Sequence, residues 1–203
     1  MSTDNCHQND RMYKLETYEW DNPWWEHTEN KTAPVYLYIG DSISRGTRPE
    51  LNKAAAGKAL FDGFATSKAL DNPFLIPSLE LFMKQSRKYE AILFNNGLHG
   101  WHIKDGEEYF DFYCRTLDFL CSTGIPVYVV LTTNLPFDKE RNSRVETRNR
   151  LAIKAAEKFG CKVIDLYSAS LECEGKYCDD GVHFHCDGYE ILAQRIIKDL
   201  SIK

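Results

Sequence analysis

The stretch Val35-Tyr36-Leu37-Tyr38-Ile39-Gly40-Asp41-Ser42 runs from an apolar segment directly into Gly-Asp-Ser. A short apolar run bounded by glycine and polar residues is typical of a buried strand followed by a turn. Such a turn would hold the Ser42 hydroxyl at the carboxyl edge of a sheet, where it can face solvent. We therefore expect residues 35–39 to form a central strand with Ser42 at its exit.

Similar apolar runs recur along the chain, and helical patterns separate them. The runs that we predict to be buried strands are residues 91–94, 127–131 and 163–166. Helices are predicted where apolar residues repeat every three or four positions, over residues 107–123, 139–159 and 188–202. This alternation predicts the α/β class, with a parallel sheet covered by helices on both faces.

The chain divides into two parts of unequal size. Residues 34–203 carry the alternating pattern, and we predict that they form one domain, which is usual for a chain of about 200 residues. Residues 1–33 are rich in charged and aromatic side chains without a sustained period. We interpret them as an N-terminal extension that wraps the domain.

Composition excludes several kinds of partner. The formal net charge is -5, and lysine and arginine are scattered, so we expect no nucleic-acid partner, which would require a basic patch. No apolar run approaches the roughly 18 residues of a membrane span, and residues 1–11 lack the apolar core of a secretory signal. We expect a cytoplasmic protein without a membrane partner. Nothing in the sequence indicates an oligomeric state.

The cysteines fit reduced thiols better than a disulfide scaffold, because there are seven of them without a framework spacing. Cys178, His183, His185 and Cys186 place four potential zinc ligands within nine residues. In an extended segment, however, Cys186 would point away from the two histidines, and the spacing matches no common zinc pattern. We therefore predict no metal site and no organic cofactor.

A second motif, Asp180-Gly181-Val182-His183, lies just ahead of the last predicted helix. A separation of three residues lets the carboxylate reach the imidazole Nδ1. The chain thus contains the parts of a nucleophilic triad, with Ser42 as nucleophile, His183 as base and Asp180 as the group that orients the base. Each motif alone is also explained by a turn or a helix cap, so the interpretation depends on their combination at one sheet edge.

These motifs make the chain resemble the SGNH hydrolases, also called GDSL esterases and lipases, over about residues 34–203. Gly40-Asp41-Ser42 matches the first block of that superfamily, and Asp180-Gly181-Val182-His183 followed by Asp187-Gly188-Tyr189 matches the last. The resemblance implies a three-layer, flavodoxin-like α/β/α fold and the hydrolysis of esters, often acetyl groups on carbohydrates. By this likeness Ser42, His183 and Asp180 keep the roles given above.

The second block of the superfamily matches less well. It supplies a glycine backbone N–H to the oxyanion hole, which also uses the N–H of the nucleophilic serine, here Ser42. In this chain Lys68 stands at the glycine position, at the end of Ala65-Thr66-Ser67-Lys68. A backbone N–H survives a change of side chain, so Lys68 can keep this role, and Gly63 is an alternative donor.

The third block, Gly-x-Asn-Asp in the superfamily, aligns with Gly97-Leu98-His99-Gly100, so His99 falls where the oxyanion-binding asparagine belongs. A neutral imidazole still has one N–H to donate to an oxyanion. Asn96, or less favourably Asn95, would serve the same purpose in a differently built loop. The sequence leaves His99 and the asparagines as open alternatives.

The predicted activity is hydrolysis of a small acyl ester, in particular an acetyl ester, on a small molecule or a saccharide. Trp101 follows the predicted oxyanion loop and is our candidate for contact with a sugar ring, although large aromatics, including Trp20, Trp24 and Trp25, also serve as packing. The arginines between residues 141 and 150 are interpreted as a solvated helix face. Two rival functions are an inactive carbohydrate-binding protein on the same fold and a metal-dependent protein built on residues 178–186.

Overall fold

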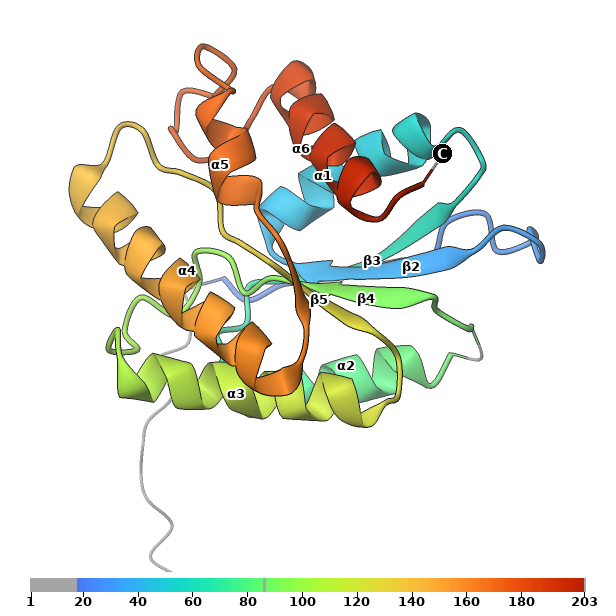
Figure 1. Cartoon of the computed structure of the whole chain (residues 1–203), viewed down its shortest axis with the longest axis horizontal. Coiled ribbons are helices and arrows are strands. Elements are labelled where there is room, and N and C mark those ends of the chain that lie inside the picture. Colours follow the sequence, from blue (N-terminus) through green and yellow to red (C-terminus); the bar gives the residue numbers. More distant parts are fainter. Residues whose placement is uncertain (1–17, 86, 203) are drawn as a thin grey trace, which may run out of the picture.

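The computed structural model describes residues 18–85 and 87–202. Helices and strands alternate along most of the chain (Figure 1). The strands are β1 (Asp21–Trp24), β2 (Val35–Gly40), β3 (Leu60–Thr66), β4 (Ala91–Phe94), β5 (Val127–Val130) and β6 (Lys162–Ile164). The helices are α1 (Ser42–Ala55), α2 (Leu75–Met83), α3 (Glu107–Ser122), α4 (Lys139–Phe159), α5 (Leu166–Leu171) and α6 (Cys186–Asp199).

The six strands form one sheet in the order β1-β3-β2-β4-β5-β6. All neighbouring strands from β3 to β6 are parallel, and their order in the sheet, β3-β2-β4-β5-β6, is that of flavodoxin-like folds. The predicted α/β class and the predicted strands at β2, β4, β5 and β6 are confirmed. The sheet contains two strands that the sequence pattern does not predict, β3 and β1, and β1 runs antiparallel to β3, with Asp21 opposite Thr66.

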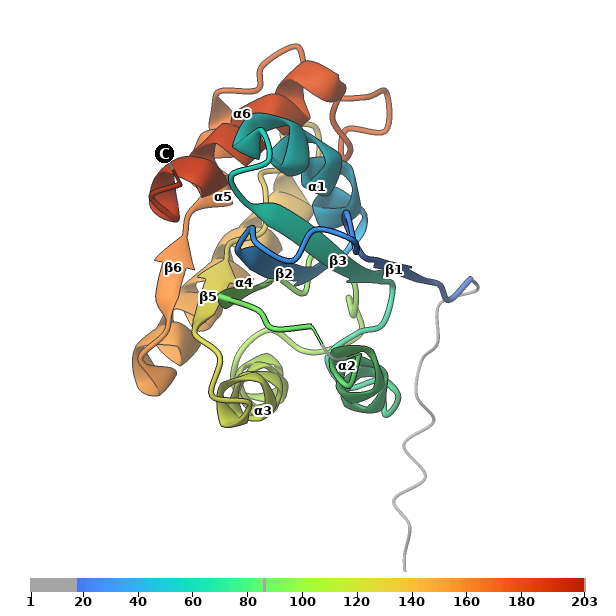
Figure 2. The same ribbon diagram turned by 90° about the vertical axis from the view of Figure 1, so that its right-hand side faces the viewer.

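Helices cover both faces of the sheet, which gives the three layers visible in Figures 1 and 2. On one face α1, α5 and α6 pack against Tyr38, Phe61 and Leu93. On the other face α2, α3 and α4 pack against Leu37, Ile39 and neighbouring apolar residues of the sheet. Because side chains alternate along a strand, the two faces of β2 supply both cores, and its carboxyl end comes to lie between them.

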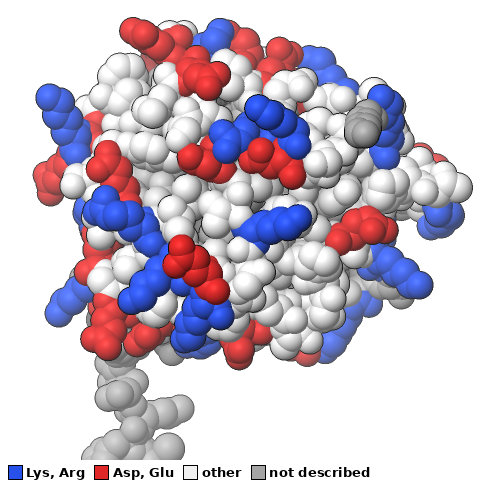
Figure 3. All heavy atoms as spheres, in the orientation of Figure 1, with Lys and Arg blue, Asp and Glu red and all other residues white. Residues whose placement is uncertain are grey.

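The surface carries a mixed distribution of charge. Figure 3 shows acidic and basic side chains interspersed over one face of the molecule. None of the helices in the described parts of the chain combines the length and the apolar composition that crossing a bilayer requires.

Candidate active site

Ser42 is the first residue of α1 and follows β2 after one residue, Asp41. The Asp41 carboxylate caps the helix, because its Oδ1 accepts the Ile43 N–H at 2.9 Å. Gly40 allows strand and helix to approach, since a Cβ there would lie only 2.7 Å from Ser44 Cβ. The Ser42 side chain is partly exposed, and the amino-terminal end of a helix favours negative charge at this position.

The loop between α5 and α6 brings His183 to Ser42. His183 Nε2 lies 2.8 Å from Ser42 Oγ, and His183 Nδ1 lies 2.6 Å from Asp180 Oδ2. The other oxygen of Asp180 accepts the N–H groups of Val182 and His183, both at 2.9 Å, which fixes the turn. With Nδ1–H donating to Asp180, Nε2 is left to accept the Ser42 O–H. The structure therefore joins the two motifs, 141 residues apart for Ser42 and His183, in one hydrogen-bonded chain.

Electrostatics keep Asp180 ionised at neutral pH. The hydrogen bond from the His183 side chain, helped by the two backbone N–H groups, lowers the pKa of Asp180 to about 2. The Asp180 and His183 side chains are 50% and 39% exposed, so water screens the pair and its main effect is to orient the imidazole. The stability that it contributes is present above the ordinary carboxyl pKa and is lost as the pH falls towards 2.

Short main-chain contacts hold the loop that carries His183. The Cys178 N–H donates to the His183 carbonyl at 2.8 Å, and the His185 N–H donates to the Lys176 carbonyl at 2.8 Å. Gly181 has a φ of +67°, and a Cβ there would lie 2.7 Å from Phe137 Cδ2 in the segment after β5. The loop that carries His183 is thus held by its own main-chain hydrogen bonds and by its contact with Phe137.

Asp41 also connects the start of α1, at Ser42, to the loop after β4. Its Oδ2 accepts the Leu98 N–H at 3.2 Å, and the side chain is 2% exposed. Gly97 has a φ of +68°, and a Cβ at this position would overlap the Asp41 carboxylate. Only glycine fits here, so the middle residue of Gly-Asp-Ser holds both the start of α1 and the loop that follows β4.

The two asparagines after β4 have different surroundings. Asn95 Nδ2 donates to the Val130 carbonyl at 2.7 Å and ties β4 to β5. Asn96 Nδ2 points instead to the Lys68 carbonyl at 3.4 Å, and within the described chain its buried Oδ1 has no hydrogen-bond partner. Because β2 lies between β3 and β4, the Asn96 side chain reaches across the end of the strand that leads to Ser42.

The other predicted oxyanion donors already make contacts of their own. The Lys68 N–H donates to Thr66 Oγ1 at 3.1 Å, so it already has an acceptor, while Gly63 lies within β3, opposite Tyr38 of β2. The His99 ring lies edge-on to Trp20, with 6.3 Å between ring centroids and an interplanar angle of 77°. Asn96 is thus the candidate donor whose side-chain amide lies between the loop after β3 and the loop after β4.

Comparison with known proteins supports this picture at the level of the fold. No protein-family model matches the sequence, and neither does any curated protein. A lipolytic G-D-S-L family member from Veillonella parvula matches with a TM-score of 0.64 and 20% identity, covering 83% of this chain and 99% of that one. An acetyl xylan esterase matches with a TM-score of 0.62 and 16% identity, covering 82% and 99%. The chain has the SGNH-hydrolase fold.

The SGNH-hydrolase fold also occurs in a protein named as a transferase. The catalytic domain of peptidoglycan O-acetyltransferase A from Streptococcus pneumoniae matches with a TM-score of 0.65 and 19% identity, covering 83% of this chain and 93% of that domain. TM-scores of this size show a common architecture, and at identities this low the residues of the site have to be judged on their own geometry.

On this SGNH scaffold, Trp101 packs among arginines. The guanidinium carbons of Arg144 and Arg148 lie 4.9 and 5.0 Å from the Trp101 ring centroid, and that of Arg141 lies 5.6 Å away. The interpretation of these arginines as a solvated helix face is wrong for Arg148, which is 3% exposed and donates to Asp105 and to the carbonyls of the loop. Contact between Trp101 and a substrate stays a prediction.

The segment rich in cysteine and histidine is engaged in other contacts. Cys178 Sγ lies 3.8 Å from His185 Nδ1, and His183 faces Ser42. Across residues 18–85 and 87–202, no three histidine, cysteine or acidic side chains are arranged to hold a metal ion, and Cys6 lies outside the described residues.

Sequence reasoning missed the contributions of the first described residues and of Asp41. Trp20 and Asp21 contact the end of β3 and the loop after it. The Asp41 carboxylate accepts a hydrogen bond from the loop after β4. The signal for Asp41 was present in the motif itself, because a buried Asx cap between a strand and a helix can accept from two directions. No local pattern marks Trp20, since its contacts join residues 46 or more positions apart.

Proposed function

We propose that this chain is a serine esterase that hydrolyses small acyl esters, in particular acetyl esters. The observation that carries the proposal is the 2.8 Å separation between Ser42 Oγ and His183 Nε2, continued by 2.6 Å between His183 Nδ1 and Asp180 Oδ2. A serine hydroxyl becomes nucleophilic when a neighbouring base can take its proton, and the base works best when a third group fixes its tautomer.

In the acylation step, Ser42 Oγ attacks the ester carbonyl carbon while its proton passes to His183 Nε2. Asp180, which is ionised at neutral pH, stabilises the imidazolium that results. When the tetrahedral intermediate collapses, the bond to the alcohol oxygen breaks and His183 returns the proton to that oxygen. Water then attacks the acyl-Ser42 with His183 as base, which releases the carboxylic acid and restores the serine.

Three donors are available for the developing oxyanion in this proposal. The Ser42 N–H lies in the first turn of α1, where backbone donors have no partner within the helix. Asn96 Nδ2 supplies the side-chain donor, supported by its weak 3.4 Å contact and its place across the end of β2. The Lys68 N–H contributes if it turns from Thr66 Oγ1 towards the substrate.

The substrate class rests on the neighbours and on the partly open site. Two proteins of the same fold are named for acetyl groups on glycans, an acetyl xylan esterase and a peptidoglycan O-acetyltransferase. We therefore propose an acetylated saccharide, or a small alcohol ester of similar shape, as substrate. No step of this mechanism requires a cofactor.

A covalent probe tests the proposal directly. A fluorophosphonate should label the wild-type chain at Ser42, because only an activated serine reacts with it, and the Ser42→Ala variant should not be labelled. Turnover of p-nitrophenyl acetate should fall by about 10⁴ or more in that variant. Ser44→Ala, two residues further along the same helix, is the matched control and should keep its labelling. Unchanged turnover in Ser42→Ala would refute the assignment.

The same experiment separates the esterase from the rival functions. An inactive carbohydrate-binding protein on this fold would bind acetylated sugar without reacting with the probe, and a metal-dependent protein would lose activity with a chelator rather than with Ser42→Ala. Labelling of folded, metal-free wild-type protein is the result that we expect.

A further inference from the structure

The residues just before and at the start of β1 are fastened to the loop after β3. The Trp20 N–H donates to Ser67 Oγ at 2.8 Å, and the Ser67 N–H donates to the Trp20 carbonyl at 3.1 Å. Ser67 Oγ donates to Glu19 Oε2 at 2.7 Å. Asp21 accepts from the Lys68 ammonium at 2.6 Å. Trp20 is therefore held by its main chain, and its ring plays no part in this anchoring.

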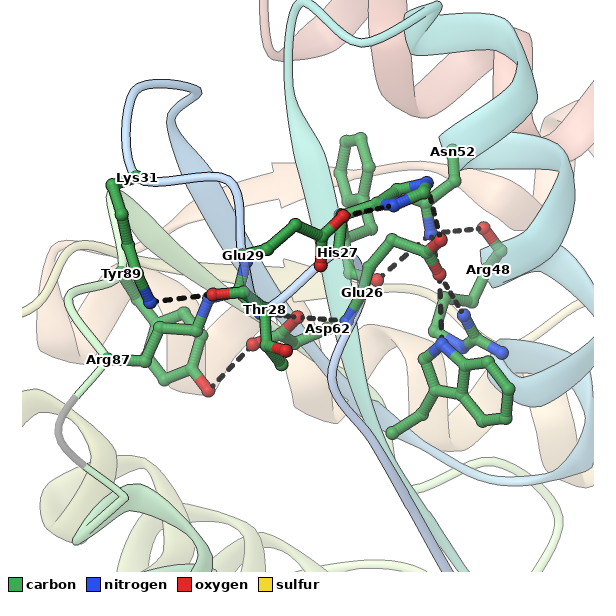
Figure 4. A network of polar contacts seen from close by, with 12 residues as sticks. Glu26, His27, Thr28, Glu29, Lys31, Arg48, Asn52, Asp62, Arg87 and Tyr89 are labelled. Carbon is green, nitrogen blue, oxygen red and sulfur yellow. Dashed lines mark hydrogen bonds and ion pairs between the residues drawn. The ribbon is translucent and has the colours of Figure 1, made fainter.

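A second set of contacts fastens the other end of this segment (Figure 4). Glu26 accepts from Arg48 at 3.0 Å and from Asn52 at 3.2 Å, and its N–H donates to Asp62 at 2.8 Å. The Asp62 side chain is fully buried and is also paired with Arg87 at 3.0 Å. Hydrogen bonds thus hold residues 19–26 at both ends, and those at residues 19–21 fix the main chain from which the Trp20 ring extends.

The Trp20 ring lies against His99 from the loop after β4. Trp20 is anchored at the end of β3, and His99 follows β4, so their contact crosses the line of β2, the strand that leads to Ser42. Both residues are partly exposed. The pair accordingly places two aromatic rings at the carboxyl edge of the sheet, the edge at which Ser42 follows β2.

The His183 loop lies on the opposite side of β2 from Trp20. Gly181 packs under Phe137 in the segment after β5, and Tyr177 Oη donates to the Asn134 carbonyl in the same segment at 3.3 Å. In the sheet order, β5 and β1 lie on opposite sides of β2. The base therefore approaches Ser42 from the side of β5, while Trp20 lies on the side of β1 and His99 reaches Trp20 from the loop after β4.

We propose that Trp20, together with His99, closes the acyl side of the site and limits the acyl chain to a short one. The inference rests on the proposed esterase function. In the tetrahedral intermediate the leaving oxygen must face His183 and the oxyanion must face its donors, so the acyl substituent takes the remaining direction, away from His183. In this proposal the Trp20 and His99 rings lie in that direction, and we expect them to accommodate a methyl group and to exclude longer chains.

The test compares p-nitrophenyl acetate with p-nitrophenyl butyrate. Trp20→Ala removes the ring and keeps the main-chain bonds to Ser67, so the ratio of kcat/KM for butyrate over acetate should rise by about 10-fold, the gain expected for burying two further methylene groups. Trp20→Leu should move the ratio in the same direction by less. Trp24→Ala is the matched control, because Trp24 lies at the other end of β1 against Arg48, and it should leave the ratio unchanged.

Labelling by the fluorophosphonate keeps the two proposals distinguishable. A wild-type chain that turns over acetate, with a butyrate-to-acetate ratio that stays the same in Trp20→Ala and Trp20→Leu, overturns the acyl-wall proposal alone. An equal loss on both esters in Trp20→Ala, with the ratio unchanged, also overturns it, because it indicates a merely structural role. A folded wild-type chain that neither reacts with the probe nor hydrolyses either ester overturns the esterase and the acyl wall together.

Discussion

Asn96 and His99 stand three positions apart in sequence but face different parts of the site. Asn96 points across the end of β2 to the loop after β3, whereas the His99 ring rests against Trp20. If Asn96 is the oxyanion donor, Asn96→Ala should lower kcat for p-nitrophenyl acetate by about 10²- to 10³-fold with little change in KM. His99→Ala should keep kcat for acetate within about 10-fold, since the ring is then a wall rather than a donor. Steady-state kinetics on the two variants distinguish the donors. A larger fall in kcat for His99→Ala than for Asn96→Ala would assign the oxyanion contact to His99 instead.

The hydrogen-bonded arrangement of Ser42, His183 and Asp180 could be predicted from sequence, but the side chain that would bind an oxyanion could not, and the reason is physical. Asp180 and His183 form a local turn whose geometry follows from their spacing, and Ser42 follows directly from an apolar strand. The identity of the donor depends on how the loop after β4 bends. That bend is set by Gly97 at positive φ against the buried Asp41, a contact between positions far apart in the chain.

At the level of elements, four strands and the three predicted helices followed the sequence pattern, while β1, β3, α1, α2 and α5 were not predicted. β3 and α1 show the reason most clearly. β3 contains Asp62 and Gly63 in its middle, which interrupts the apolar run. Both residues have tertiary reasons to be there: Asp62 is paired with Arg87, and Gly63 makes room for Arg48, whose Cδ would lie 2.7 Å from a Cβ. α1 contains Gly46 and Pro49, so intrinsic propensity argues against a helix that packing against α6 stabilises.

Gly46 lets α1 pack closely against Tyr189 of α6. A Cβ at Gly46 would overlap the Tyr189 ring, so Gly46→Ala should destabilise the protein by about 1–3 kcal/mol, opposite to the usual stabilising effect in a helix. Because α1 begins with Ser42 and α6 follows the His183 loop, a shift between them should also slow fluorophosphonate labelling, by about 10²-fold for a displacement of 1 Å.

Urea unfolding and labelling rates measure the two effects of Gly46→Ala. The double variant with Tyr189→Ala removes the overlapping ring and should recover most of the labelling rate. A Gly46→Ala protein that is as stable and as reactive as the wild type would show that the α1–α6 contact does not position the site.

At the scale of the whole molecule, β1 closes an edge of the sheet that would otherwise expose the backbone of β3. The sequence suggested a boundary at residue 34, with residues 1–33 as an extension. The described part of that extension is joined to the domain through buried polar groups, because Arg48 is 8% exposed, Asp62 is fully buried, and Glu26 bonds to both. We therefore expect the segment around Glu26 to contribute to global stability rather than to lie loosely on the surface.

Glu26→Ala tests this expectation. The change leaves the Arg48 guanidinium in a buried position without its carboxylate, and removing one partner of a buried pair costs about 3–5 kcal/mol of the free energy of unfolding. The matched control is Glu29→Ala, because Glu29 pairs with His27 where both side chains are largely exposed, and such a pair contributes about 0–1 kcal/mol. Urea unfolding of the full chain should show a lower midpoint for Glu26→Ala alone. Equal midpoints for the two variants would mean that the domain holds together without this network, and the boundary at residue 34 would then be a true one.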